Sequence, residues 1–513
     1  MIRTGSDINA DVTETADVCV VGTGCGGATL GMRLAEKGMR VVFLERGGYY
    51  TREDFDQREV DMLAKIDGGR GLDASDDLSV SLTYGNNVGG ASVHYWADSY
   101  RTPPDRIKLW RERYGIEGHD EAELTPLFEE IEKDLGVHTA ERQEFNKMNL
   151  LLERGARILG WHGDLVPQAR RGCIGSGYCM QGCAYDAKQS MLVTYVPRAL
   201  SRGALLYADC EAHALEWNGS KVKALVARVL DRATGRPTGK KVRVEATTFV
   251  VAAGGYGTPV FLLRQGLKEK LPALGRYTAC NPCPMTHALF DEDIKQWRGI
   301  PAAFGIDEWR LPRFDGDRYR EGGYLLMANQ LQPGTLAAVL PGVGRSHRDL
   351  MARLPRLGGV ISWIDDLPEG HVSLRDDGTP AYHVPLTGQN GQMIRDAYAK
   401  QAKLLFAVGA REVLFADIHD TRIKGDAEIE RAVAALEITP ASNTLAAPHP
   451  AGGARMGKDP KESVVGFDHR VHGTDNLFVA DPSVFPTAPS VDPSLTIMAW
   501  SAIAARHIAA SMR

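Results

Sequence analysis

The chain has 513 residues, of which 43% are hydrophobic and 24% are charged. This composition is typical of a globular protein and too apolar for a disordered one. Sixty Lys and Arg residues against 65 Asp and Glu residues give a net charge of −5, with no dense basic run. The charge balance therefore disfavours a nucleic-acid-binding protein. At roughly 100–200 residues per domain, the length predicts two or more domains, or one large domain with insertions.

No stretch of about 18 apolar residues occurs, so the sequence predicts no membrane-spanning helix. The first 17 residues are polar and acidic and do not resemble a secretion signal. We therefore expect a cytoplasmic protein, and a periplasmic one only if a partner subunit exports it. Eight cysteines are too few for a disulfide scaffold of this size.

The first predicted unit is a strand, a glycine-rich turn, a helix and a second strand. An apolar run at residues 17–21 leads directly into Gly22-Thr23-Gly24-Cys25-Gly26-Gly27, which fits the pattern G-x-G-x-x-G. The next eleven residues have helical periodicity and end at Gly38. Residues 40–44 form the second apolar strand, and Glu45 follows it.

This spacing predicts a dinucleotide site. Gly22, Gly24 and Gly27 allow the backbone to approach a pyrophosphate at the positive end of the helix. Glu45 lies 18 residues after Gly27, where a carboxylate can accept hydrogen bonds from ribose hydroxyls. An acid at this position argues against a 2′-phosphate and hence against NADP, which leaves FAD or NAD.

Four further segments follow in order. Residues 84–94 form a second glycine-rich loop, and residues 249–254 form a third apolar strand that a glycine-rich turn follows. Residues 476–481 are a strand that ends in Asp481. The segment 492–497 begins a helix that continues to residue 510.

With these motifs and His449-Pro450-Ala451-Gly452-Gly453, the chain resembles the glucose–methanol–choline (GMC) family of FAD-dependent oxidoreductases. The resemblance implies an α/β fold, in which a Rossmann-like FAD-binding domain carries an inserted α+β substrate-binding domain. The expected FAD-binding segments are residues 1–105, 190–290 and 440–513. The expected substrate-binding segments are residues 106–189 and 291–439.

The resemblance also assigns cofactor-binding residues. Those expected to line the ribityl chain and ring of the flavin are Gly89, Gly90, Ala91, Ser92 and His94. Asp481 is expected near the ribityl chain and pyrophosphate, and the backbone of Pro493 near the pyrimidine edge. Two alternatives stay open: Asp481 could only cap a turn with Pro482, and His94 could be a hydrogen-bonded core histidine.

His449 is the expected catalytic base. In the family, the histidine of this segment lies beside the flavin N5 and removes the hydroxyl proton of the substrate, so that the carbon can release a hydride. Imidazole suits this step because its ordinary pKa lies near neutrality.

The second catalytic position of the family, usually His or Asn, corresponds to Asp492, which is a departure. An ionised carboxylate can only accept a hydrogen bond, whereas Asn can also donate one. Asp492 could form an ion pair with His449, be protonated by burial, or act as the base itself. We favour the first two accounts.

A cysteine-rich segment at residues 172–183 contains Cys173, Cys179 and Cys183. The spacing resembles that of FAD-dependent glucose dehydrogenase catalytic subunits, which carry a three-iron (3Fe-4S) cluster and pass electrons to a small or cytochrome subunit. It also resembles a segment of long-chain alcohol oxidases, for which no cluster is implied. The main alternatives are an iron–sulfur cluster and reduced structural thiols. Three cysteines leave a four-iron cluster one ligand short, unless Cys280 or Cys283 supplies it. A zinc site would also need a fourth ligand.

These features together predict an FAD-dependent dehydrogenase that oxidises a CH–OH group of a sugar or other alcohol. The expected acceptor is not oxygen, mainly because the cysteine spacing suggests outward electron transfer. An oxidase of the same family, which would produce hydrogen peroxide from an alcohol, sugar or sterol, is the first alternative. A lyase that holds FAD without net redox chemistry is the second.

Overall fold

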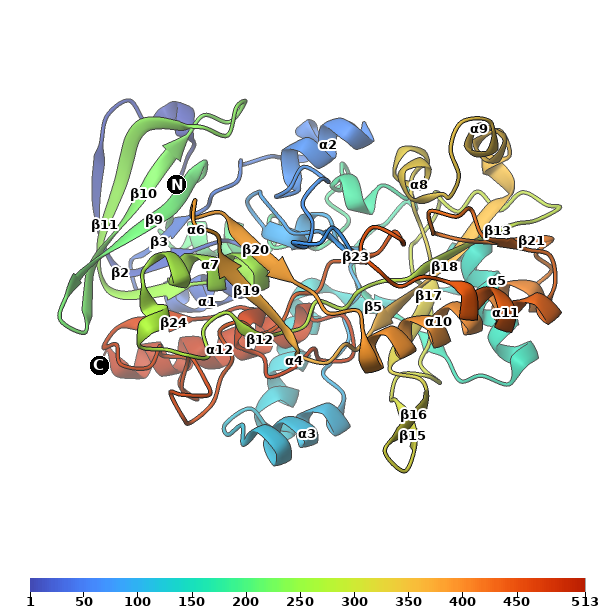
Figure 1. The fold of residues 1–513 in the computed structure, drawn as a ribbon. Coiled ribbons are helices and arrows are strands. Elements are labelled where there is room, and N and C mark those ends of the chain that lie inside the picture. The colour runs from blue at the N-terminus through green and yellow to red at the C-terminus, as the bar shows by residue number, and fades with distance from the viewer. Residues whose placement is uncertain (513) are drawn as a thin grey trace.

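The fold was analysed in a computed structural model, which describes residues 1–512. Its first sheet has eight strands in the order β1-β8-β3-β2-β11-β10-β9, and β24 also pairs with β11 (Figure 1). The strands β3, β2, β11 and β24 run parallel to one another. The bounds are β1 Ile2–Arg3, β2 Val12–Val21, β3 Val41–Leu44, β8 Leu205–Tyr207, β9 Cys210–Asn218, β10 Lys221–Leu230, β11 Pro237–Val251 and β24 Leu477–Val479.

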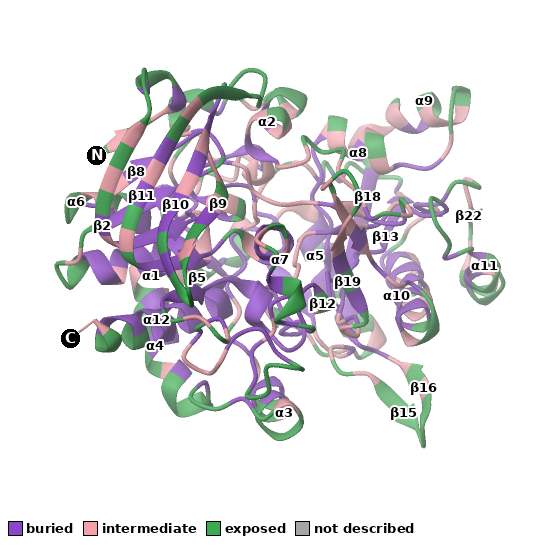
Figure 2. Ribbon diagram, turned by 60° about the vertical axis from the view of Figure 1, so that its left-hand side comes forward, coloured by how far each residue is buried: buried purple, intermediate pink, exposed green. Residues whose placement is uncertain are grey.

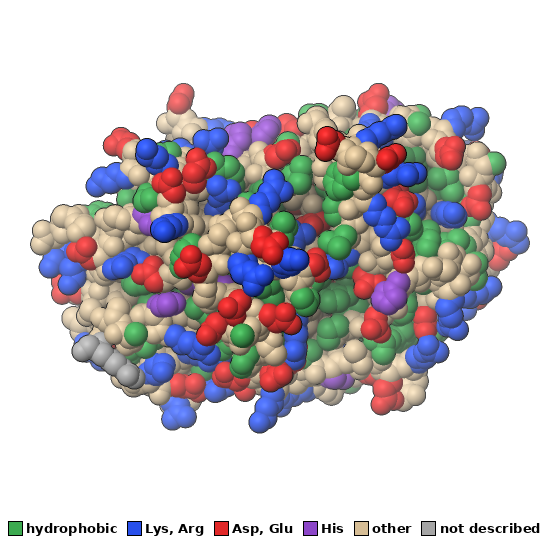
Figure 3. Space-filling view, turned by 90° about the horizontal axis from the view of Figure 1, so that it is seen from below, with side chains coloured by type: hydrophobic (Ala, Val, Ile, Leu, Met, Phe, Trp, Pro, Cys, Tyr) green, Lys and Arg blue, Asp and Glu red, His purple; other side chains and the backbone are tan. Residues whose placement is uncertain are grey.

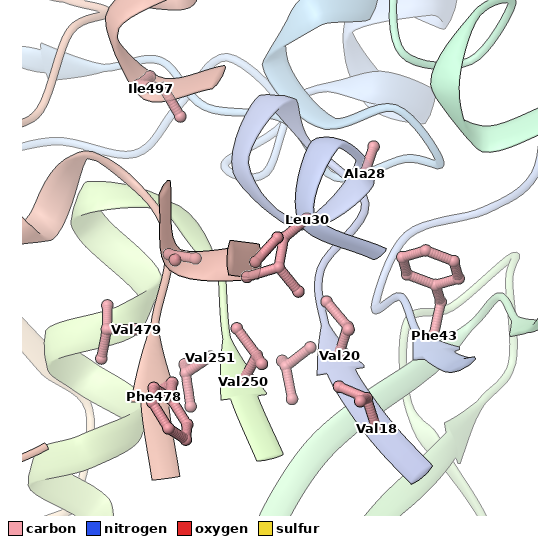
Figure 4. Close-up of a cluster of buried hydrophobic side chains, with 14 of the residues drawn as sticks. Val18, Val20, Ala28, Leu30, Phe43, Val250, Val251, Phe478, Val479 and Ile497 are labelled. Carbon is pink, nitrogen blue, oxygen red and sulfur yellow. The ribbon is translucent and has the colours of Figure 1, made fainter. Parts of the chain in front are cut away.

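Helices cover this sheet and bury its apolar side chains. The helix α1 (Cys25–Glu36) follows β2 directly and packs against α12 (Ser494–Ser511). Figure 4 shows Leu30 of α1 above Val20 of β2 and Val250 of β11. All three side chains are fully buried in one apolar cluster. Because β2 and β11 are buried on both faces, their last residues are continuously apolar, which is typical of parallel strands.

The second sheet has seven strands in the order β22-β21-β13-β18-β17-β14-β6 and forms the other half of the molecule (Figure 1). Its neighbouring strands are antiparallel. Two helices, α5 (Lys147–Leu159) and α10 (Gly388–Ala407), pack against it. The bounds are β6 Asp164–Leu165, β13 Met285–Leu289, β14 Phe304–Ile306, β17 Tyr324–Ala328, β18 Leu357–Ile364, β21 Glu412–Phe415 and β22 Arg422–Ile423.

Smaller elements complete the fold. The remaining helices are α2 Glu59–Ile66, α3 Pro104–Tyr114, α4 Glu121–Leu135, α6 Tyr195–Ser201, α7 Gly254–Arg264, α8 Pro333–Val339, α9 Arg345–Met351 and α11 Ile429–Ala435. The remaining strands are β4 Ser81–Leu82, β5 Val137–Thr139, β7 Pro167–Ala169, β12 Arg276–Thr278, β15 Arg313–Asp315, β16 Arg318–Glu321, β19 Gly370–Leu374, β20 Pro380–His383 and β23 Ala446–Ala447. Figure 2 shows that buried residues concentrate in the sheets and inner helices, whereas the β15–β16 hairpin is exposed.

The predicted α/β fold is confirmed. The domain division stays a prediction, and the packing favours other bounds at two of its edges. The helices α3 and α4 were expected in the substrate-binding domain, yet Trp110 and Leu127 belong to the apolar cluster of the first sheet. Conversely, β13 was expected in the FAD-binding domain and is a strand of the second sheet. We therefore propose domain edges near residues 137 and 284.

The surface carries charges of both signs. Figure 3 shows Lys and Arg side chains interspersed with Asp and Glu over the face that it presents. In the part of the chain that the structure describes, no helix combines the length and apolar character needed to cross a lipid bilayer.

Candidate functional site

The first glycine-rich turn brings the start of α1 close to the ends of two strands. Gly22 has a φ of 92°, and a Cβ atom there would lie 2.3 Å from the carbonyl oxygen of Ala252. A Cβ atom at Gly27 would lie 2.1 Å from the carbonyl oxygen of Gly22. Gly24 is the N-cap of α1, so the first free N–H groups of the helix follow it. Only glycine allows this close approach of helix and strands.

The second glycine-rich loop lies against the first. The N–H of Gly89 donates a hydrogen bond to Oγ1 of Thr23 (3.0 Å), and a Cβ atom at Gly90 would lie 2.7 Å from the Cα of Gly24. Gly89 and Gly90 both have positive φ values, of 98° and 57°. Ala91 is exposed at the start of the short helix that follows. The two loops form a backbone-lined cradle at a helix N-terminus, which fits the pyrophosphate of a dinucleotide.

Glu45 lies at the end of β3, where the sequence predicted a ribose-binding acid. Its Oε2 accepts hydrogen bonds from the N–H (3.0 Å) and hydroxyl (2.7 Å) of Thr23, and its Oε1 accepts one from the N–H of Gly47 (2.9 Å). Burial raises the pKa of Glu45, and these hydrogen bonds oppose the rise. Because a carboxylate offers about four acceptor positions, about one is left for a ribose hydroxyl.

Ser92 and His94 have different roles in the loop. The hydroxyl of Ser92 donates to the carbonyl of Gly89 (2.6 Å) and accepts from the N–H of Met191 (2.9 Å), so this side chain stabilises the loop itself. His94 is buried, and among the described residues its Nε2 has no hydrogen-bond partner. Burial, and the nearby Lys188 ammonium, lower the pKa of His94 to about 3. The neutral imidazole therefore has a nitrogen available to a ligand, and the contact of His94 with the flavin stays a prediction.

Asp481 follows β24 and is fully engaged by the protein. Its Oδ1 accepts from the N–H of Ser483 (2.9 Å), and its Oδ2 accepts from the N–H of Gly254 (2.9 Å) and from the hydroxyl of Thr258. Asp481 therefore caps the turn that begins at Pro482 and ties it to the start of α7. Pro493 is the buried N-cap of α12. The predicted cofactor contacts of Asp481 and Pro493 stay predictions.

His449 lies two residues after β23, with 16% of its side chain exposed. Its Nδ1 is 2.8 Å from Oδ1 of Asn281, and its ring lies 5.0 Å from that of Trp363 between centroids. Burial lowers the pKa of His449 to about 3. The free imidazole is therefore neutral at physiological pH and can accept a proton, but burial makes it a weaker base than the imidazole of near-neutral pKa that the sequence predicted.

The structure brings Asp492 next to His449. Oδ1 of Asp492 is 3.4 Å from Nε2 of His449, while Oδ2 is buried and has no hydrogen-bond partner among the described residues. Burial raises the pKa of Asp492. Burial and the charge of Asp492 together raise the pKa of a second carboxyl, Asp98, well above its usual value. The distance alone would permit an ion pair with His449, but the lowered pKa of His449 keeps the imidazole neutral, and the pKa of about 7 of Asp492 leaves part of this carboxyl in its acid form at neutral pH.

The three cysteines of residues 172–183 line one pocket, together with Arg170 and Lys188. Among residues 1–512, however, no three Cys, His, Asp or Glu side chains are placed to hold a metal ion. Burial raises the pKa of Cys179 to about 12, which favours the thiol over the metal-binding thiolate. The predicted iron–sulfur cluster is therefore not supported.

Cys280 and Cys283 do not line the pocket of the other three cysteines, and among the described residues they complete no metal site with them. The N–H of Cys283 donates to the carbonyl of Ala446 (2.8 Å), just before the segment that carries His449. Both cysteines are buried free thiols.

Three residues at the site were missed in the sequence. Asn281, Asp98 and Trp363 surround the pair His449 and Asp492, and none belongs to a motif. The only signal was positional, because Asn281 lies between the two cysteines at 280 and 283. Contacts such as Asn281 with His449 span 168 residues and leave no local pattern.

Comparisons with known proteins agree with this architecture. Family models described as GMC oxidoreductase match residues 19–283 and 366–501. An uncharacterized GMC-type oxidoreductase of Mycobacterium tuberculosis (strain H37Rv) is 31% identical over 491 residues, which cover 95% of this chain and 74% of that protein. A long-chain-alcohol oxidase of Arabidopsis thaliana is 26% identical over 532 residues, which cover 97% of this chain and 68% of the oxidase.

A solved structure shows the same fold. The formate oxidase of Aspergillus oryzae RIB40, in an R554K variant studied for FAD modification, aligns with a TM-score of 0.72 at 16% identity. The alignment covers 98% of this chain and 99% of the oxidase. Because the family models match most of the sequence and a relative above 30% identity is covered over most of its length, the chain belongs to the GMC oxidoreductase family.

Proposed function

We propose that the chain binds FAD and oxidises the CH–OH group of an alcohol. The observation that carries the proposal is the placement of a neutral imidazole, His449, beside the buried carboxyl of Asp492, with 3.4 Å between Nε2 and Oδ1. The glycine cradle of residues 22–27 and 89–90 supports the cofactor, because it exposes backbone N–H groups at a helix N-terminus.

The chain's own residues prepare the substrate for oxidation. Bound FAD supplies the acceptor for the hydride that leaves the carbinol carbon. Nε2 of His449 removes the hydroxyl proton, since its Nδ1 is already engaged with Asn281. Protonated Asp492 donates a hydrogen bond to the substrate oxygen and thereby replaces the donor that the family usually has at this position. Low solvent exposure of both side chains strengthens these interactions.

The surroundings of His449 favour a hydrophobic alcohol over the sugar suggested by the cysteine spacing. Trp363 lies against the imidazole, and Trp96 packs against Trp363 with 5.9 Å between ring centroids. Met327 and Val491 belong to the same apolar cluster as Trp363. A sugar has hydroxyl groups on most carbons, and an apolar wall would leave them without hydrogen bonds. The name of the Arabidopsis relative, a long-chain-alcohol oxidase, is consistent with this choice.

The second candidate function is an oxidase that uses oxygen as the electron acceptor. The expectation of a non-oxygen acceptor rested mainly on the cysteine spacing, and no metal-holding arrangement of these cysteines among the described residues supports it. The name of the Arabidopsis relative also favours an oxidase. An oxygen electrode with the purified holoenzyme and its alcohol distinguishes the two. Rapid hydrogen peroxide formation identifies an oxidase, and reduction of an artificial dye without oxygen uptake identifies a dehydrogenase.

Anaerobic bleaching of the flavin tests the proposed reaction. The holoenzyme is mixed with 1-dodecanol, cholesterol or D-glucose, and the loss of flavin absorbance is followed. We expect bleaching by 1-dodecanol or cholesterol, and a rate about 10²–10⁴ times lower in His449→Gln, because general-base catalysis contributes about that factor. The control is His138→Gln, at an exposed histidine in another part of the molecule.

Two results would contradict the proposal. If no alcohol bleaches the flavin while the protein still turns over a substrate, the lyase alternative is correct. If His449→Gln is reduced as fast as the wild-type protein, another residue removes the proton.

A further inference from the structure

We infer that Asn281 is a positioning residue that fixes the tautomer of His449, so that the proton is on Nδ1 and the lone pair on Nε2. Only the expected effect on the rate of flavin reduction depends on the proposed function. The proton assignment itself follows from three hydrogen-bonding groups in a row: the carbonyl of Ile364, the amide of Asn281 and the imidazole of His449.

The orientation of the Asn281 amide is set by a backbone carbonyl. Its Nδ2 donates a hydrogen bond to the carbonyl oxygen of Ile364. A carbonyl oxygen can only accept, so rotating the amide by 180° would place two acceptors against each other. The nitrogen must therefore face Ile364, and Oδ1 must face His449.

The tautomer of His449 then follows. Oδ1 of Asn281 lies 2.8 Å from Nδ1 of His449, within hydrogen-bond distance. Since an amide oxygen has no proton to give, Nδ1 must carry the hydrogen. In a neutral imidazole the other nitrogen is then unprotonated, and this is Nε2, the atom that faces Asp492 at 3.4 Å.

The backbone of Asn281 is also held in place. Its N–H donates to Oδ1 of Asp366 (2.8 Å), and the N–H of Cys280 donates to Oδ2 of the same carboxyl (2.9 Å). Asn281 is 5% exposed and has a φ of 58°, in the left-handed region that Asn tolerates better than most residues. Such a fixed, buried amide can hold the imidazole of His449 in one orientation over many catalytic cycles.

Asn281 lies just before β13, whereas His449 lies after β23, so the contact joins two segments that are distant in the chain. Without it, the imidazole could adopt the other tautomer, with the proton on Nε2. That form cannot accept the hydroxyl proton of a substrate from the Asp492 side. The amide therefore selects the reactive form of the base before any substrate binds.

The test uses Asn281→Gly, because glycine adopts a φ of 58° without strain and removes the side chain that carries the amide. Holoenzyme is labelled with ¹⁵N-histidine, and the ring nitrogens of His449 are assigned by the signals missing in His449→Gln. For the wild-type protein at neutral pH we expect a protonated Nδ1 and an unprotonated Nε2. For Asn281→Gly we expect a mixture of tautomers. A wild-type spectrum with the proton on Nε2 overturns the inference.

Kinetics provides the second readout. With 1-dodecanol as the reductant, Asn281→Gly is expected to lower the limiting rate of anaerobic flavin reduction by about 10- to 100-fold, as loss of an orienting partner of a histidine typically does. The substrate concentration that gives half the limiting rate should change less than about twofold, because uniform binding is unaffected. An unchanged limiting rate contradicts a positioning role.

The two readouts separate this inference from the proposed function. If His449→Gln is reduced at the wild-type rate, the proposed base is wrong, and the nitrogen signals of the wild-type protein still decide the tautomer. If Asn281→Gly shifts the tautomer but not the rate, the hydrogen bond is structural only. Asn281→Gly should bind FAD in the same amount as the wild-type protein and unfold in one cooperative transition, at a lower temperature because the Ile364 carbonyl loses its partner; these two results exclude misfolding as the cause.

Discussion

Gly24 and Gly27 lie three residues apart in one turn, but a methyl group added at each would meet different surroundings. At Gly27 the new Cβ would lie 2.1 Å from the carbonyl oxygen of Gly22, about 1 Å closer than such atoms approach in proteins. At Gly24 the nearest atom would be the Cα of Gly90 at 3.8 Å, an ordinary contact, and the φ of −68° suits alanine. The two substitutions therefore separate folding from cofactor binding.

Gly27→Ala is expected to lower the free energy of unfolding by about 1–3 kcal/mol or more, because α1 must move away from the strands. Gly24→Ala is expected to change it by less than about 1 kcal/mol. The loss of a glycine N-cap and the reduced entropy of the unfolded chain are of similar size and opposite sign. In the cradle, however, the Gly24 methyl would face the pyrophosphate. We expect the FAD affinity to fall at least about tenfold, or about 1.4 kcal/mol.

Thermal unfolding of the apoproteins measures the first effect, and titration of apoprotein with FAD, followed by quenching of flavin fluorescence, measures the second. The matched pair makes the reasoning refutable. If Gly24→Ala binds FAD with unchanged affinity, the turn does not hold the pyrophosphate. If Gly27→Ala is as stable as the wild-type protein, the close approach to the Gly22 carbonyl does not affect the free energy of unfolding.

Two further substitutions probe the site and the core. Asp492→Asn is expected to keep measurable flavin reduction, because Asn can also donate to the substrate oxygen; complete loss with FAD bound would show that the carboxyl group itself is required. Burial raises the folded-state pKa of Asp492 above its unfolded value of about 3.9. The stability that its acid form contributes is therefore fully present below about pH 3.9 and is lost as the pH rises through the folded-state pKa. In thermal unfolding measured from acidic to alkaline pH, the stability of Asp492→Asn relative to the wild-type protein should therefore increase as the pH rises. A stability difference that is independent of pH would contradict a raised pKa. Trp500→Ala should lower the free energy of unfolding by about 3–5 kcal/mol, since Trp500 is buried against Trp110 and Phe485, whereas Ile158→Ala at an exposed position should have little effect.

The part of the fold that could be predicted from sequence is the part whose signals are local. The turn at residues 22–27 and the apolar runs on either side specify β2, α1 and β3 within a few residues. The start of β2 was missed because Val12 to Thr15 alternate between half-buried and exposed positions and do not form an apolar run. Alternation of this kind is the signal of a strand with one solvent-facing side.

The rest depended on contacts between distant segments. Nothing near α3 and α4 shows that they pack beside α12, whose residues lie more than 350 positions later. His449 and Asp492 were predicted from family motifs, but their partner Asn281 has no motif and is recognised only from the fold. The cysteine spacing allowed a metal cluster, and only the three-dimensional positions of the side chains show that, among the described residues, they share a pocket without the arrangement of a metal site.

The late arrival of β24 has a consequence for how the protein folds during its synthesis. Residues 249–251 of β11 pair with residues 477–479, whereas β10 covers the earlier part of the same edge. The end of β11 therefore stays uncovered on this edge until more than 200 further residues have left the ribosome. Throughout that interval the nascent chain exposes an apolar strand end that can join a wrong neighbour. Slower translation would lengthen this interval, so we expect a chaperone that shields the unfinished sheet to raise the yield of folded protein.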